Sequence, residues 1–399
     1  YTYRGGIRMI ERNLEKVLLK RSTEYPVVTL TGPRQSGKTT LVRKLFSDHT
    51  YVNLEDTEAR LLAQRDPKGF FSRYPAPVIV DEFQRVPELA STIMVNVDAN
   101  RKKKGQYILT GSHQPLLQQA VSQTLAGRTA LLRLLPFSIN ELRHVPRQKT
   151  DVDALILQGG MPEVCTEHLE PHAYYRNYFQ TYIERDVRQL MEIRNLPAFE
   201  RFMVLLAGRV GQLVNLSGLS TEVGVSHTTL SGWLSLLEAS FVVFRLQPFF
   251  SNISKRVVRS PKLYFTETGL ASYLLGLENE KQVMRDPLRG QLFENLIVTE
   301  LLKARVNKDA DPQLYFLRTE KGFEIDIIHR QGSELIPIEI KSSMSYHPDF
   351  VRNLKTFCET EKQARNPLLI YAGDSYPSFE GVRCLNYLET SGFDDQGKE

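Results

Sequence analysis

The segment Gly-Pro-Arg-Gln-Ser-Gly-Lys-Thr at residues 32–39 restricts the possible folds of this chain more than any other stretch. It follows an apolar run at residues 27–30 and precedes Leu41, Val42 and Leu45, which are spaced as on one face of a helix. A glycine loop between a strand and a helix is the arrangement of a phosphate-binding P-loop. The sequence therefore predicts an α/β fold with a P-loop domain built on a parallel sheet.

The residues of this loop have distinct expected roles in holding a nucleotide. The two glycines let the backbone turn its N–H groups toward a triphosphate, and the start of the following helix adds partial positive charge. Lys38 is expected to reach the β- and γ-phosphates, and the Thr39 hydroxyl to ligate Mg²⁺. The predicted cofactors are thus ATP and Mg²⁺, and the predicted contacts are Gly32, Pro33, Arg34, Gln35, Ser36, Gly37, Lys38, Thr39 and Thr40.

A second apolar run, at residues 77–80, ends in two adjacent carboxylates. Such a strand, about 40 residues after a P-loop, is typical of the second half of a P-loop ATPase site. Asp81 is expected in the Mg²⁺ shell, and Glu82 is expected to polarise the attacking water.

Two later segments supply further candidates for the same site. The strand predicted over residues 107–112 ends in small polar residues, so Thr110 or Ser112 either contacts the γ-phosphate or caps the next helix. Arg128 precedes another apolar run. It either stabilises transition-state charge on the nucleotide of a neighbouring subunit or is an ordinary surface arginine.

Length and composition limit the class of protein. A chain of 399 residues predicts two or three domains, and 41% hydrophobic with 24% charged residues is ordinary for a globular protein. A net charge of +5 permits a nucleic-acid partner. The three cysteines show no metal or disulfide spacing, and no apolar run reaches the roughly 18 residues of a membrane span, so we expect a cytoplasmic protein without a membrane partner.

Around the P-loop segments the sequence predicts a first domain at residues 9–146. Its first helix is expected over residues 9–21, with Arg12, Lys16 and Lys20 on a solvated face. A helical linker is expected at 151–210. It includes one long helix over 174–193, whose Arg185, Asp186 and Arg188 are either an inter-subunit ion-pair network or a solvated face.

Residues 211–262 show the pattern of a winged helix-turn-helix. A short helix and a glycine turn are expected over 216–226, a second helix over 227–237 and a strand over 241–246. The second helix exposes small polar side chains but no arginine or lysine. DNA contact and subunit packing therefore both remain open, with phosphate contacts expected from Lys255, Arg256 and Arg259.

The last predicted domain, residues 263–390, places carboxylates in a second pattern. Glu294 lies among apolar residues of a helix, Asp326 lies on a strand, and Glu339 and Lys341 share one face of the next strand. This spacing resembles the restriction-endonuclease-like nuclease fold. The resemblance implies that Glu294, Asp326 and Glu339 bind Mg²⁺ and that Lys341 helps to activate water. The alternative is an inactive binding module.

Taken together, the motifs of the chain resemble the prokaryotic AAA+ ATPases of the AAA_14 type, which carry a C-terminal domain of unknown function. The resemblance rests on residues 32–39, 78–84, 109–112, 125–128, 182–188, 264–270, 323–326 and 338–341. It implies an ATPase that works as a homo-oligomeric, hexameric ring. Together with the winged-helix and nuclease-like patterns, this favours an ATPase that binds and remodels or processes DNA. The alternatives are an ATP-dependent signalling or scaffold switch that binds protein and, third, a defence nuclease switched by ATP.

Overall fold

The computed structural model describes residues 9–112, 123–182, 195–250 and 258–393. The chain forms two compact units. The first contains the residues up to 137 together with 239–241 and 306–310. The second contains residues 138–238, 242–305 and the chain from 311 onward. None of the helices in the described ranges is long and apolar enough to cross a membrane.

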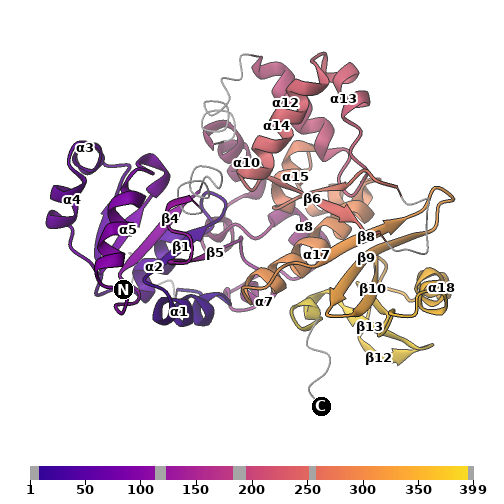
Figure 1. Cartoon of the computed structure of the whole chain (residues 1–399). Helices are drawn as coiled ribbons and strands as arrows, with labels where there is room; N and C mark the ends of the chain where they lie inside the picture. Colours follow the sequence, from indigo (N-terminus) through magenta and orange to yellow (C-terminus); the bar gives the residue numbers. More distant parts are fainter. Residues whose placement is uncertain (1–8, 113–122, 183–194, 251–257, 394–399) are drawn as a thin grey trace. The chain divides into compact units, whose positions relative to one another are not determined.

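A sheet of five parallel strands forms the centre of the first unit (Figure 1). Its strands are β1 (Val27–Thr31), β2 (Thr50–Asn53), β3 (Val78–Asp81), β4 (Tyr107–Gly111) and β5 (Thr129–Arg133), in the order β2-β3-β4-β1-β5. The predicted α/β fold with a parallel sheet is confirmed. Because carboxyl ends of parallel strands share one edge, the P-loop after β1 and Asp81 at the end of β3 lie at the same edge.

Helices cover both faces of this sheet. Alternate strand residues point to opposite sides, so Val28 and Leu30 belong to one apolar core and Val27 to the other. Helices α1 (Glu15–Glu24) and α2 (Lys38–Leu45) pack on the first core. Helices α3 (Thr57–Arg65), α4 (Pro67–Arg73) and α5 (Leu89–Ala99) pack on the second, and a short 3-10 helix, η1 (Phe83–Arg85), follows β3.

The first helix begins later than its apolar spacing predicts. Residues 9–12 precede α1, and the backbone N–H of Arg12 donates to the Glu15 carboxylate at 2.9 Å. The prediction that Arg12 lies on a solvated face is wrong, because this side chain is only 6% exposed. Its guanidinium binds two backbone carbonyl groups instead, and this fixes the non-helical course of the segment.

The second unit begins with short helices. Of the long helix predicted over 174–193, residues 174–182 are described: α-helix to Tyr178 and a π-helical turn over 179–182. Residues 183–194, with the predicted network of Arg185, Asp186 and Arg188, lie outside the described residues. The helices are α7 (Ile139–Leu142), α8 (Val152–Gln158), α9 (Pro162–Thr166), α10 (Pro171–Tyr178), α12 (Leu196–Ala207), α13 (Leu216–Val223), α14 (His227–Ala239), α15 (Thr268–Leu274) and α16 (Glu280–Arg285).

An eight-stranded mixed sheet organises the rest of this unit (Figure 1). Its strands are β6 (Val243–Pro248), β7 (Lys262–Phe265), β8 (Leu314–Arg318), β9 (Glu324–Gln331), β10 (Glu334–Lys341), β11 (Leu368–Tyr371), β12 (Tyr376–Phe379) and β13 (Val382–Asn386). The order is β12-β13-β11-β10-β9-β8-β6-β7. Helices α17 (Arg289–Val306) and α18 (Arg352–Thr360) and the 3-10 helices η3 (Pro348–Val351) and η4 (Tyr387–Gly392) complete the unit.

The strands after α14 join this same sheet. Strand β6 pairs antiparallel with β7 and parallel with β8. The predicted boundary between residues 262 and 263 therefore falls inside β7 and not between domains. Alternation along one strand does not reveal which sheet the strand enters, and so the pattern alone could not place this boundary.

Candidate functional site

The P-loop has the backbone conformation that its glycines predict. Gly32 has φ 147° and Gly37 has φ 91°, backbone angles that residues with a Cβ rarely adopt. A Cβ at Gly32 would lie 2.1 Å from the carbonyl oxygen of Leu134. Gly37 is the residue directly before α2. The loop is thus a tight backbone cradle that ends at a helix N-terminus, which fits the phosphates of a nucleotide.

Lys38 is held inside this cradle. Its ammonium donates to the carbonyl oxygens of Gly32 at 3.0 Å and Pro33 at 2.7 Å, and the side chain is buried. Burial lowers the pKa of Lys38 to about 8, although the nearby carboxylates of Glu82 and Asp81 act in the opposite direction. A buried ammonium held by two backbone carbonyls is suited to exchange them for phosphate oxygens.

Asp81 is the centre of a hydrogen-bond network at the same sheet edge. Its carboxylate accepts from the hydroxyls of Thr39 at 2.7 Å and Tyr51 at 2.9 Å, and also from Thr110. Thr110 reaches Asp81 because its strand, β4, lies next to β3 in the sheet. The pairing of Thr39 with Asp81 brings together the two predicted Mg²⁺ ligands, and the residues fit the cation. No pattern in the sequence indicated that Tyr51 contacts this site.

Glu82 has an unusual backbone conformation, with φ 55°. Its carboxylate accepts a hydrogen bond of 2.5 Å from the Gln84 side-chain amide. Burial raises the pKa of Glu82, while Lys38 acts to lower it. A carboxylate with a raised pKa and a left-handed backbone is typical of a functional position. Gln84, two residues after the predicted catalytic acid, is a contact that the sequence did not reveal.

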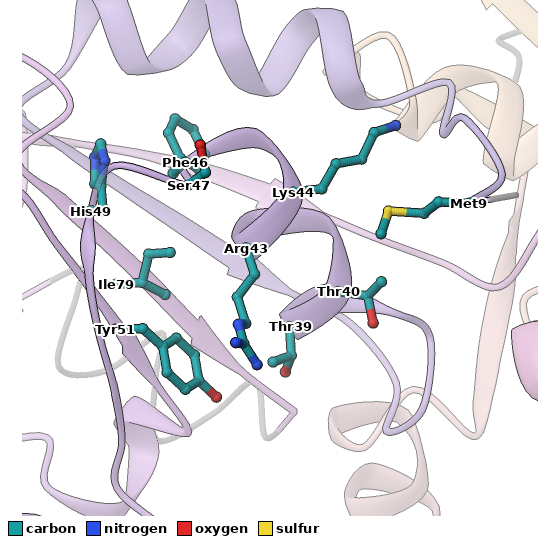
Figure 2. Close-up of a pocket in the computed structure, with 10 residues that line it drawn as sticks. All are labelled: Met9, Thr39, Thr40, Arg43, Lys44, Phe46, Ser47, His49, Tyr51 and Ile79. Atoms are coloured by element: carbon teal, nitrogen blue, oxygen red, sulfur yellow. The ribbon is translucent and has the colours of Figure 1, made fainter. Parts of the chain in front are cut away.

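A pocket of about 160 Å³ opens beside α2 (Figure 2). Thr39 and Thr40 of the P-loop line it, and Figure 2 shows the Arg43 guanidinium between Thr39 and Tyr51. The Arg43 guanidinium lies 4.7 Å from the centre of the Tyr51 ring. The pocket is smaller than the roughly 300–1,000 Å³ of ordinary ligand sites. It therefore reaches Thr39 and Tyr51 but does not have room for a whole nucleotide.

Two other predicted site residues lie at different places. Ser112 is buried and directly follows β4, at the P-loop edge. Arg128 precedes β5, whose first residue is in register with Val27 of β1, so it lies at the opposite end of the sheet. Five strand residues correspond to roughly 16 Å. Arg128 also binds Asp98 through two contacts of 2.9 and 2.8 Å, so it does not join the P-loop cluster of its own chain.

In the second unit, carboxylates and lysines gather on β7, β9, β10 and α17. Lys341 lies 2.5 Å from Glu339 and 3.6 Å from Asp326, and the Ile340 N–H donates to Asp326 at 2.9 Å. Glu294 on α17 instead accepts from Lys262 at 3.1 Å and from the Tyr264 hydroxyl at 2.6 Å. We call these four carboxylates and two lysines the second cluster: Glu294, Glu324, Asp326, Glu339, Lys262 and Lys341.

Burial and the neighbouring charges together shift the pKa values of the second cluster. Burial raises the pKa of Glu294, and it raises that of Glu339 to about 8. Burial alone would lower the pKa of Lys262, but the charges of Glu294, Asp326 and Glu324 outweigh it and raise that pKa. Lys262 and Glu324 were not predicted from the sequence, although a lysine within the apolar strand 261–265 is a usable signal.

The second cluster does not fit a divalent cation as it stands. Among the described residues, no three acidic, histidine or cysteine side chains are grouped so that they could hold a metal. Glu339 Oε2 is buried without a hydrogen-bond partner in the described structure, which is what a missing cation would leave. Glu294, however, is already bound to an ammonium. The predicted Mg²⁺ site of Glu294, Asp326 and Glu339 is therefore not formed in this arrangement.

Three family models match successive parts of the chain. A model described as an AAA domain matches residues 24–143, a domain of unknown function (DUF8612) matches 149–281, and a domain of unknown function (DUF4143) matches 289–389. The first confirms the predicted AAA_14 type. The second spans both the predicted linker and the predicted winged helix. The chain thus carries an AAA-type P-loop domain followed by two domains of undefined activity.

Relatives extend over most of the chain. The uncharacterized protein Rv2008c of Mycobacterium tuberculosis is 31% identical over 379 residues, which cover 94% of this chain and 82% of that protein. An uncharacterized protein of Haemophilus influenzae is 23% identical, covering 83% and 86%. The Walker-type ATPase paby2304 of Pyrococcus abyssi is similar in structure, with 15% identity, 67% and 96% coverage and a TM-score of 0.43. The chain belongs to the same family as Rv2008c, with an AAA domain as the part that carries its P-loop.

Proposed function

We propose that this chain hydrolyses ATP with Mg²⁺ and uses the reaction to bind and remodel or process DNA. The observation that supports the ATPase most directly is the convergence of Lys38, Thr39, Asp81 and Glu82 at one edge of the parallel sheet. Lys38 and Thr39 begin α2, directly after the loop that follows β1, and Asp81 and Glu82 lie at the end of β3 and directly after it. Each has the chemistry that phosphoryl transfer requires.

Each residue has a defined part in the proposed reaction. Lys38 exchanges the carbonyls of Gly32 and Pro33 for phosphate oxygens. Thr39 and Asp81 would hold Mg²⁺, which when bound neutralises charge on the β- and γ-phosphates. Glu82 orients the attacking water and accepts its proton, since burial raises the pKa of this carboxylate.

A ring is proposed because Arg128 lies too far from the P-loop of its own chain. The two lie at opposite ends of β1 and β5, so an Arg128 that acts on a nucleotide would have to reach that of a neighbouring subunit. A homo-oligomeric ring, for which we propose six subunits, brings such an arginine to every site. Asp98 would then position the guanidinium in each subunit.

Basic and polar surfaces support DNA as the partner. The first residues of α14, His227 and Thr228, are exposed, and so is Arg259. The loop after α5 exposes Arg101 and three consecutive lysines, residues 102–104. Side chains of this kind are suited to phosphate contacts, which depend on salt. Lys255 and Arg256, predicted for the same role, lie outside the described residues.

The test is ATP hydrolysis measured alone and with duplex, single-stranded or four-way-junction DNA, at two salt concentrations. We expect one DNA form to stimulate hydrolysis and higher salt to weaken the stimulation. The Lys38→Ala variant is expected to lose hydrolysis under every condition. Hydrolysis that no DNA form changes would contradict the DNA proposal while leaving the ATPase proposal intact.

A protein-binding signalling or scaffold switch is the alternative. It is favoured by the sequence of α14, which contains neither arginine nor lysine. A helix of this kind is suited to packing against another protein surface as well as to DNA. DNA-independent hydrolysis, with a partner protein captured only in the ATP state, is the result expected of this alternative.

Metal-dependent DNA cleavage by the second unit is a further candidate. Support comes from the mutual contacts of Asp326, Glu339 and Lys341 on β9 and β10. Asp326→Ala is expected to abolish any cleavage and to leave ATP hydrolysis unchanged. An Asp326→Ala protein that cuts as well as the wild type would disprove this site. Cleavage also requires Glu294 as a metal ligand, and in the structure this carboxylate is bound to Lys262.

A further inference from the structure

The second cluster contains a buried lysine, Lys262, which was not among the residues predicted for this site. Lys262 lies at the start of β7, and its side chain is 3% exposed. Its ammonium is 3.1 Å from Glu294 and 2.7 Å from Glu324. It also lies 5.6 Å from the centre of the Phe316 ring. A lysine so buried is held by its carboxylate partners rather than by solvent.

We infer that Lys262 competes with a divalent cation for Glu294, so that the second cluster stays closed to metal until this ammonium is displaced. The inference rests on the cleavage candidate proposed above, whose predicted metal ligands are Glu294, Asp326 and Glu339. It adds a residue from β7 that controls whether this ligand set can form.

The contacts of Glu294 give the reason. Its Oε1 atom accepts from both the Lys262 ammonium and the Tyr264 hydroxyl. A divalent cation bound to that carboxylate would lie beside a fixed positive charge in a buried site, where like charges repel strongly. The metal and the lysine therefore exclude one another at Glu294.

The charges of the cluster are consistent with this exclusion. Lys262 pairs with Glu294 and Glu324, whereas Lys341 contacts Glu339 and Asp326. Each ammonium thus serves two carboxylates. Removing Lys262 leaves Glu294 without its cation, in the same cluster as the unpartnered oxygen of Glu339, whereas Glu324 keeps the Arg318 guanidinium at 3.6 Å. That arrangement favours uptake of a cation from solution.

Metal binding can be measured directly on the full chain without nucleotide. Mn²⁺ binding is followed by calorimetry, and Tb³⁺ binding by luminescence excited through tyrosine, because Tyr264 lies 2.6 Å from Glu294. The variants are Lys262→Met and Lys262→Gln, with Lys262→Arg as the matched control that keeps the charge. Asp326→Asn identifies the part of the signal that comes from the second cluster. Gln can still donate to Glu294, so it provides a second variant if Met prevents folding.

We expect the neutral variants to bind Mn²⁺ at least about tenfold more tightly than the wild type and Lys262→Arg. This gain should disappear when Asp326→Asn is added. Equal affinity in the wild type and both neutral variants, abolished by Asp326→Asn, would overturn the role of Lys262 but keep the metal site. No Asp326-dependent binding in any variant would overturn both the inference and the cleavage candidate.

Discussion

The guanidinium of Arg12 donates a hydrogen bond of 2.9 Å to the carbonyl oxygen of Ser36, in the middle of the P-loop. The same guanidinium donates to the carbonyl oxygen of Leu135 at 2.6 Å and lies 4.7 Å from the centre of the Phe137 ring. Arg12 therefore ties the segment before α1 to the loop and to the chain after β5. It contacts the backbone of the loop, so its role is to position the loop and not to bind the nucleotide.

Replacing Arg12 by methionine is expected to weaken ATP binding and to destabilise the first unit. Buried hydrogen bonds from a charged group contribute about 1.5–3 kcal/mol each, and their loss leaves the Ser36 carbonyl less well positioned. The measurements are binding of a fluorescent ATP analogue and thermal unfolding. Lys16→Met, which changes an exposed cation in the first turn of α1, is the control. Unchanged ATP affinity in a folded Arg12→Met protein would show that the loop does not depend on this contact.

Replacing Glu82 by glutamine is expected to preserve ATP binding and to lower the hydrolysis rate by about 10²-fold or more, as for the loss of a general base. Lys38 and Thr39 are untouched by this change, so the affinity for ATP should remain. Single-turnover hydrolysis and equilibrium binding separate the two effects. Glu88→Gln changes an exposed carboxylate six residues after Glu82 and should behave as the wild type. Equal losses of binding and hydrolysis in Glu82→Gln would assign this residue to the structure of the site.

Replacing Arg128 by alanine is expected to lower the rate of hydrolysis by about 10³-fold with little change in ATP affinity, as for an arginine supplied by a neighbouring subunit. Mixing this variant with Glu82→Gln chains should restore part of the activity, because some interfaces then combine an intact arginine with an intact acid. Arg101→Ala is the matched control, since Arg101 also binds Asp98. A mixture that stays inactive would contradict the proposal that Arg128 acts across subunits.

The P-loop site could be predicted because its signals are local. A glycine loop directly after a strand, and two carboxylates at the end of another, place Lys38 and Asp81 at one edge of any parallel sheet. Tyr51, which donates to Asp81, and Arg12, which donates to Ser36, carry no local signal because their roles depend on contacts 24 or more residues away.

The second cluster shows the same limit. The alternation of β10 places Glu339 and Lys341 on one face, and they do contact each other. The prediction grouped Glu294 with them through the resemblance to the nuclease fold. The partner of Glu294 is Lys262, because β7 enters the same sheet through β6. Pairing between distant strands decides which charges meet, and a single sequence does not contain that information.

A buried acid in the second unit predicts how stability depends on pH. Glu267 is 5% exposed, and its carboxylate accepts a hydrogen bond of 2.8 Å from the Gly160 N–H. Burial raises the pKa of Glu267, although Lys303 acts to lower it. The folded state then holds this proton at pH values where the unfolded chain, with a pKa near 4.3, has lost it.

Stability should therefore fall as the pH rises from the ordinary carboxyl pKa to the raised value, by at most about 1.4 kcal/mol per pH unit, and change no further above it. Glu267→Gln cannot ionise, so its free energy of unfolding should increase relative to the wild type over that range. Trp233, the one tryptophan of the chain, lies in the second unit, and its fluorescence during urea unfolding at several pH values reports on that unit. Glu163→Gln, at an exposed position, is the control for exchanging a carboxylate for an amide. The contrary result is a difference in the free energy of unfolding between Glu267→Gln and the wild type that is the same at every pH. Glu267 would then not titrate during unfolding, and Lys303 and the backbone would fully compensate its burial.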